Sequence, residues 1–133
     1  MAVISITRLR LRSWRFVPEF IFSSVRAKLQ AEKAEGNRGV RVMREPGNIF
    51  WTATAWDSED AVKKYMIASP HGQAMRRLLE WCDEAALVRW TQDSAELPDW
   101  NEAHRRLQAE GRRSKVNHPS ANQQQFRISA PKK

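Results

Sequence analysis

The sequence predicts an α+β domain whose elements follow the order β-α-β-β-α-β, with one more helix near the C-terminus. Three observations predict this order. Residues 3–12 alternate side chains with the period of two that strands show. Residues 18–34 and 70–82 repeat apolar residues at spacings of three and four, as helices do. Turn and capping residues separate these segments, and 133 residues suit one domain.

The first strand and first helix each present a distinct apolar side. Leu9 and Leu11 share one side of the strand, and the opposite side carries Arg8, Arg10 and Arg12. We expect these arginines to pair with acidic groups from the middle of the chain or to bind an anion. Pro18 fits the first turn of a helix that ends before Gly36. Its predicted buried stripe comprises Phe22, Val25 and Leu29.

A second strand over 39–44 leads through a turn at Pro46 and Gly47 to the strongest strand pattern, residues 49–56. Both sides of this third strand are largely apolar, with Trp51 on one side and Trp56 on the other. Both sides should therefore be covered. Helices can cover one side, and we expect a second subunit to cover the other.

The remaining elements complete the pattern. A short helix beginning at Asp57 or Ser58 contains Tyr65, and a second helix begins after Ser69, with Cys82 on its apolar stripe. A fourth strand covers 85–91. Asp99 to Glu102 forms a capping box that opens a last helix, which ends near Gly111. This is the split βαβ, or ferredoxin-like, order.

Charge divides the chain into a domain over residues 1–111 and a basic, flexible tail over 112–133. The net charge of +8 separates into +7 for residues 1–44, −6 for 45–102 and +7 for 103–133. The tail has few large apolar residues and could dock only through residues 125–128. Nucleic-acid binding through this tail is one hypothesis, which we rank last because no base-reading motif is present.

His71 is the strongest candidate for chemistry. It stands at the start of the helix that follows Ser69, on the same side as Met75, where the helix N-terminus disfavours a charged imidazole. A neutral, inward imidazole can accept a proton or hold a polar ligand. The alternative is a core histidine bonded to the backbone. His104 and His118 are expected on the surface.

Several classes of function lack the residues that they need. The single cysteine, Cys82, excludes a disulfide framework and is expected to be a small buried side chain. We find no metal-ligand spacing, phosphate-binding glycine loop or serine nucleophile motif. The chain also has no apolar stretch long enough to span a membrane and no secretory cleavage pattern. We therefore expect a cytoplasmic protein that binds no metal.

Three segments resemble the antibiotic-biosynthesis-monooxygenase-like group of the dimeric α/β-barrel superfamily. They are residues 50–61, 69–75 and 97–103, and the resemblance covers about residues 1–110. It implies a ferredoxin-like subunit that forms a homodimer by pairing its sheet face to face with a partner's sheet. Members that act as enzymes oxidise aromatic polyketides without a prosthetic group, or degrade haem. Their pockets lie between the sheet and the helices of one subunit.

The resemblance also points to individual residues. Haem-degrading members have Asn, Trp and His at the positions that here hold Thr7, Tyr65 and Met75, so their haem chemistry is not implied for this chain. A pocket is implied, ringed by Thr7, Tyr65, His71 and Met75, with Trp51 or Trp56. We expect a cofactor-independent monooxygenase for a small apolar or aromatic molecule, with His71 as base and Tyr65 orienting the substrate. The alternative is a non-catalytic ligand-binding or structural homodimer.

Overall fold

The computed structural model describes residues 1–68 and 71–131, without the side chains of residues 71–75. Its described residues form an antiparallel sheet of five strands in the order β2-β3-β1-β4-β5. The strands are β1 (Ala2–Leu11), β2 (Asn37–Glu45), β3 (Ile49–Trp56), β4 (Cys82–Gln92) and β5 (Arg112–Arg113). The first four occur in the predicted order, and the two-residue β5 extends the sheet beside β4.

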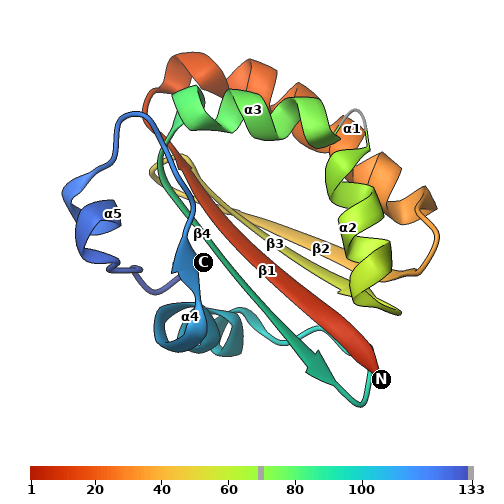
Figure 1. Cartoon of the computed structure of the whole chain (residues 1–133). Helices are drawn as coiled ribbons and strands as arrows, with labels where there is room; N and C mark the ends of the chain where they lie inside the picture. The colour runs from red at the N-terminus through yellow and green to blue at the C-terminus, as the bar shows by residue number, and fades with distance from the viewer. Residues whose placement is uncertain (69–70, 132–133) are drawn as a thin grey trace.

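Helices cover both sides of this sheet (Figure 1). On one side lie α1 (Val17–Lys33), α2 (Glu59–Ile67) and α3 (His71–Trp81). On the other lie α4 (Trp100–Glu110) and α5 (Ala121–Gln125). A short 3-10 turn, η1 (Trp14–Phe16), leads into α1. The predicted α+β class and element order are confirmed, and Asp99 caps α4 through its side chain as predicted.

The two sides of the sheet form separate cores, because neighbouring residues of a strand face opposite ways. On the side we name the α4 face, Ile4, Ile6 and Trp51 pack with Ala103 and Leu107 of α4. On the side we name the α1–α3 face, one cluster joins Val3 and Trp56 to helix residues Ala31 and Val62, and a second joins Leu11 and Cys82 to Phe20 and Trp81. Cys82 is buried as predicted, although it begins β4 rather than ending a helix.

The chain's own C-terminal part covers the side of the sheet that was expected to meet a second subunit. Leu107 of α4 and Ile128 pack in the cluster of the α4 face, and Ile128 is 8% exposed. The apolarity of Trp51 and its neighbours is therefore satisfied within one chain. Consequently, the two apolar sides of β3 give no support to a second subunit.

Residues 112–131 do not extend as a tail. Arg112 and Arg113 pair with β4, and α5 follows with Ser120 as its N-cap. Gln123 is buried, and Phe126 packs against the cluster of the α4 face. The segment remains close to the sheet because Phe126 and Ile128 supply apolar contacts, as the docking alternative proposed. The domain boundary at residue 111 stays a prediction.

The predicted buried stripe of α1 is wrong. Phe22, Val25 and Leu29 are 65%, 52% and 50% exposed, whereas Phe20 and Ala31 are 6% and 1% exposed. The helix carries apolar residues on two opposite sides, and the spacing of three and four fits either. The small side chain of Ala31 allows α1 to pack closely against Val3 and Trp56, which favours the side that is buried.

Candidate functional site

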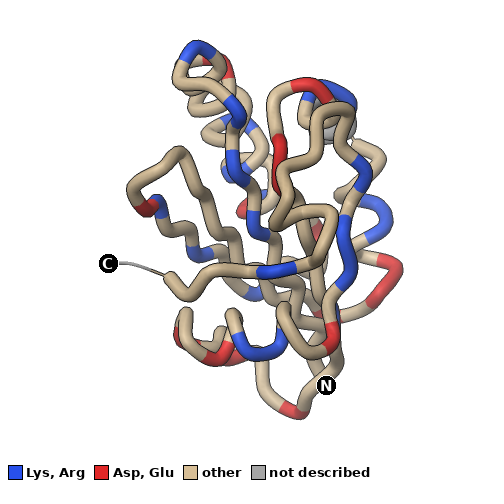
Figure 2. The backbone as a smooth tube through the Cα atoms, turned by 90° about the vertical axis from the view of Figure 1, so that its left-hand side faces the viewer, with Lys and Arg blue, Asp and Glu red and all other residues tan. Residues whose placement is uncertain are grey.

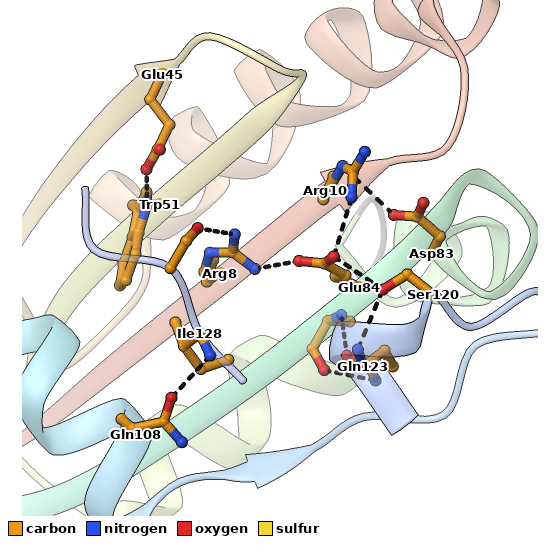
Figure 3. Close-up of polar contacts among 12 residues, drawn as sticks. Arg8, Arg10, Glu45, Trp51, Asp83, Glu84, Gln108, Ser120, Gln123 and Ile128 are labelled. Atoms are coloured by element: carbon orange, nitrogen blue, oxygen red, sulfur yellow. Dashed lines mark hydrogen bonds and ion pairs between the residues drawn. The ribbon is translucent and has the colours of Figure 1, made fainter. Parts of the chain in front are cut away.

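A buried ion-pair network occupies the α4 face (Figure 3). Arg8 Nη1 donates to Glu84 Oε1 at 2.7 Å, and the two side chains are 2% and 3% exposed. Arg10 Nη1 donates to Glu84 Oε2 at 3.1 Å, and its Nε lies 3.9 Å from Asp83 Oδ1. The expected pairing of the strand arginines with acidic residues of the middle block is therefore confirmed.

The C-terminal segment completes this network. Ser120 Oγ donates to Glu84 Oε2 at 2.8 Å, and Arg8 Nη2 donates to Ser129 Oγ at 3.0 Å. The Gln123 side chain accepts from the Ala85 N–H and donates to the Ala85 carbonyl, both at 3.1 Å. Figure 3 shows these side chains converging on the strands from a segment over a hundred residues away from Arg8.

The network is balanced in charge. Burial raises the pKa of the Glu84 carboxyl, but hydrogen bonds from Arg8, Ser120 and Arg10 and the charge of Arg8 outweigh burial, so the pKa is lowered overall. Burial is also the largest influence on Asp83, whose pKa is raised. Two guanidinium groups face two carboxyl groups, which leaves little net charge to attract an anionic ligand. We conclude that this network holds the C-terminal segment in place.

Trp51 belongs to this structural face. Its ring is fully buried, its Nε1 donates to Glu45 Oε2 at 2.6 Å, and Arg8 lies over the ring at 5.8 Å. Trp100 of α4 packs against it with ring centroids 6.3 Å apart. Trp51 thus faces away from Trp56, and the two cannot line the same pocket.

On the α1–α3 face, Trp56 and Tyr65 form a ring pair with centroids 5.1 Å apart. The Tyr65 hydroxyl donates to the Ala27 carbonyl of α1 at 3.1 Å, and burial raises the pKa of this hydroxyl to about 12. The phenol therefore remains protonated at neutral pH and can donate a hydrogen bond but cannot act as a base. Trp56 is 1% exposed, so it packs against the Tyr65 ring from the interior of the protein.

Thr7 lies in the middle of the α1–α3 face, and this part of the sheet is incompletely covered. It is paired in register with Thr52 and Leu87, and all three are only partly buried although β1 is the central strand. On the opposite face, Ile6 and Arg8 beside Thr7 are 0% and 2% exposed. We name Ser5, Thr7, Thr52 and Leu87 the open strip. The open strip is therefore less covered than the same level of the α4 face, although a hollow of about 520 Å³ on the α4 side lies farther along the sheet, beside Trp90 and Arg106.

His71 and Met75 are the remaining predicted site residues. Their side chains lie outside the described residues, so their roles stay predictions. The helix that carries them, α3, lies on the same side of the sheet as Tyr65 and the open strip (Figure 1).

Sequence reasoning missed Glu84, Ser120, Gln123 and Ser129 as partners in a network. For Glu84 a signal existed, because an acidic residue directly before a largely apolar strand is a natural partner for the arginines of a neighbouring strand. The three others come from a segment without strand or helix periodicity, where no pattern predicts which side chain turns inward. His104, expected on the surface, is partly buried with its Nε2 2.7 Å from the Ile128 carbonyl oxygen.

Two further features bear on the kind of site. In the part of the chain that the structure describes, no three histidine, cysteine or acidic side chains gather as a metal site would require. None of its helices is long and apolar enough to cross a membrane.

Comparison with known proteins supports the fold. A family model described as a domain of unknown function, DUF3291, matches residues 20–129. No curated protein matches the chain.

The solved structures that share this fold have different descriptions, as three of them illustrate. A conserved protein from Methanosarcina mazei is 17% identical, with 70% of this chain and 94% of that chain covered and a TM-score of 0.62. SnoaB, a cofactor-independent oxygenase from Streptomyces nogalater, is 17% identical over the same shares, with a TM-score of 0.55. An antibiotic biosynthesis monooxygenase is 5% identical, covers 69% and 99%, and has a TM-score of 0.62. The chain therefore has an antibiotic-biosynthesis-monooxygenase-like fold.

Proposed function

We propose that this chain, which belongs to the DUF3291 family, binds a small apolar or aromatic molecule over the open strip and oxygenates it without a prosthetic group. The observation that carries the proposal is the contrast between the two sides of the sheet. The centre of the α1–α3 face stays partly exposed at Thr7, while Ile6 and Arg8 beside it on the α4 face are buried. The fold shared with SnoaB, which is described as a cofactor-independent oxygenase, supports the choice of chemistry.

The proposed reaction needs an acidic C–H group and O2. A base removes one proton from a methylene group activated by adjoining aromatic rings, and the resulting carbanion transfers electrons to O2. The methylene carbon loses four electrons and becomes a carbonyl, while one oxygen atom enters that carbonyl and the other leaves as water. The substrate itself supplies every electron, so the protein has to bind, orient and deprotonate it.

We assign the proton transfer to His71, the first residue of α3, because a helix N-terminus favours a neutral imidazole. The open strip supplies a binding surface with the hydroxyl groups of Ser5, Thr7 and Thr52 and the apolar side chain of Leu87. Tyr65 orients the substrate at one end of this surface. Trp56 acts as a positioning residue, because its ring packs against the ring of Tyr65. Met75 contributes apolar contact from α3.

An oxygen electrode tests the proposal directly. We expect the purified chain to consume O2 with an anthrone as substrate, and His71→Ala to lower kcat by about a hundredfold or more. His118→Ala is the matched control, since His118 is exposed and pairs with Glu80 on the surface. Oxygen consumption no faster than in buffer, with anthrones and with electron-rich phenols, would contradict the proposed activity.

A second candidate is a non-catalytic ligand-binding or structural homodimer. One observation favours the absence of catalysis. The Tyr65 hydroxyl donates to the Ala27 carbonyl, so it joins α2 to α1 rather than pointing only toward a substrate. Native mass spectrometry of the protein as purified distinguishes the two candidates, because a retained small molecule together with the absence of O2 consumption supports binding without catalysis.

A further inference from the structure

The open strip ends at a guanidinium group on the edge of the sheet. Thr7 of β1 pairs with Leu87 of β4, and Leu87 pairs with Arg112 of β5, so the three residues form one row across the strands. Directly paired residues of antiparallel strands share one side of a sheet. Arg112 therefore lies on the α1–α3 side, beside the open strip. Its neighbour Arg113 points the other way, because its Nη1 donates to the Gln124 carbonyl of α5.

The charge of Arg112 is not balanced. Its side chain is exposed, and among the residues that the structure describes it has no hydrogen-bond acceptor, ion-pair partner or ring contact. The segment over 111–131, which faces the viewer in Figure 2, holds four basic residues and no acidic one. Glu110, just before this segment, lies 3.8 Å from Arg106 of α4. In the described part of the chain, the strip therefore ends at an unpaired cation, which attracts an anionic group.

A second guanidinium group, that of Arg89, lies on the same side of β4, two residues from Leu87. Diagonal neighbours on adjacent strands are about 7–8 Å apart, so Arg89 and Arg112 lie at the same edge of the strip. Arg89 Nη1 donates to Glu59 Oε2 at 3.2 Å, which balances its charge. Its Nε is buried, and the described residues offer that N–H no acceptor. Buried donors are normally satisfied, and a bound molecule with an oxygen acceptor would satisfy this one.

The opposite end of the row is apolar. Thr7 also pairs with Thr52 of β3, and Thr52 pairs with Val42 of β2, which is 54% exposed. The row thus has a cation at the β5 edge of the sheet and an apolar side chain at the β2 edge. Two strand spacings separate Arg112 from Thr7, a distance of about 10 Å. A ring system that lies over Leu87 and Thr7 therefore brings a group at its end to the guanidinium.

We propose that Arg112 binds a carboxylate of the molecule that occupies the open strip, so that the ligand is an aromatic or apolar carboxylic acid lying across the strands. Arg112 acts in the ligand site of the proposed function, on which this role rests, and it sets the charge and the direction of the ligand. A guanidinium presents two parallel N–H groups, which match the two oxygens of one carboxylate. Arg112 is thus a specificity-determining residue and takes no part in the oxygenation.

A nucleic-acid backbone is the other anion that a basic C-terminal segment suggests, and it fits less well. Binding a backbone takes several cations on one surface. Arg112 and Arg113 face opposite sides of the sheet, and the Arg113 guanidinium already donates to carbonyl groups of α5. The arrangement at the strip matches a single carboxylate better than a row of phosphates.

Fluorescence anisotropy with two matched probes tests the role of Arg112 in the full chain. Anthracene-2-carboxylate and its primary amide share one ring system and nearly one size, but only the first is charged. We expect the carboxylate to bind at least about fivefold more tightly than the amide, because it forms charge-assisted hydrogen bonds. Arg112→Gln is expected to abolish this preference and to change the Kd of the amide by less than about twofold. Arg127→Gln is the matched control, because it removes the same charge from an exposed position of the same segment.

Two further variants separate contact at the strip from general attraction. Arg112→Glu is expected to reverse the preference, so that anthracen-2-ylmethylammonium binds more tightly than the carboxylate. Leu87→Gln is expected to weaken the carboxylate and the amide by a similar factor, because Leu87 supports the rings. Circular dichroism checks that each variant remains folded. Carboxylate binding that Arg112→Gln leaves unchanged would overturn the role of Arg112, as would a carboxylate Kd above about 1 mM or displacement of the probe by a short DNA duplex.

Binding of these probes is independent of oxygenation, because they lack the ring methylene group that the proposed reaction oxidises. If the chain consumes O2 with an anthrone but shows no preference that depends on Arg112, the oxygenase proposal stands and the role of Arg112 is overturned. If the preference depends on Arg112 and no O2 is consumed, the role of Arg112 stands and the oxygenase proposal is overturned.

Discussion

A chain that ends at Gly111 is expected to lose about 5 kcal/mol or more of its free energy of unfolding, comparable to the whole stability of many domains. The truncation removes Ile128 from the core of the α4 face and Gln123 from Ala85. It also removes the Ser120 and Ser129 hydroxyls that bond to Glu84 and Arg8. The ion pair then meets water on one side, and apolar strand residues beside it become exposed. Urea unfolding monitored by circular dichroism measures the loss.

A chain that ends at Ala130 is the control for this truncation, because it keeps Ser129 and every C-terminal contact described above. Its unfolding midpoint is expected to match that of the full chain. If the Gly111 truncation instead unfolds at the same urea concentration as the full chain, the C-terminal segment contributes no cover to the sheet. Gln123→Ala in the full chain provides a milder test, with an expected loss of about 1–3 kcal/mol for three side-chain hydrogen bonds.

Glu84→Ala is expected to destabilise the protein by about 3–5 kcal/mol, because it leaves the Arg8 guanidinium buried without its carboxylate. The double variant Arg8→Met with Glu84→Leu is expected to recover most of this loss, since an apolar pair of similar volume avoids the cost of burying charge. Glu102→Ala is a surface comparison, because the partly buried Glu102 pairs with the exposed Arg105 and should change stability by less than about 1 kcal/mol. Equal effects of Glu84→Ala and Glu102→Ala would contradict the buried network.

The same carboxylate gives the stability a dependence on pH. The pKa of Glu84 is lowered in the folded protein, so the folded state binds this proton less readily than the unfolded state. The Glu84 carboxylate therefore adds to the free energy of unfolding above the ordinary pKa of Glu, and this contribution is lost as the pH falls below that pKa. In Glu84→Ala the free energy of unfolding should therefore decrease less steeply as the pH is lowered through the acid range.

Much of the fold follows from local patterns in the sequence. The alternation of side chains in β1 predicted that Arg8 and Arg10 face the opposite side of the sheet from Leu9. The capping residue Asp99 predicted the start of α4. Opposite sides for Trp51 and Trp56 followed from the period of two in β3. These features depend on neighbours within a few residues, which is the information that periodicity and capping contain.

The features that were mispredicted depend on packing between segments that are far apart in the sequence. The spacing of apolar residues in α1 fits two sides, and packing of Ala31 against Trp56 decided against Phe22 and Leu29. Ile128 reaches the sheet only because the backbone turns back at β5 and α5. The open strip became visible only when the exposure of Thr7 could be compared with that of Ile6 beside it.

A ligand that binds on the α1–α3 face should leave the α4 face, which is structural, undisturbed. Each of the six tryptophans has one indole N–H, and 1H–15N spectra resolve these groups once Trp→Phe variants have assigned them. Titration with an anthrone is expected to shift the signal of Trp56, which stacks on Tyr65, and to leave that of Trp51, which is bonded to Glu45, unchanged. A shift at Trp51 with none at Trp56 would contradict the account.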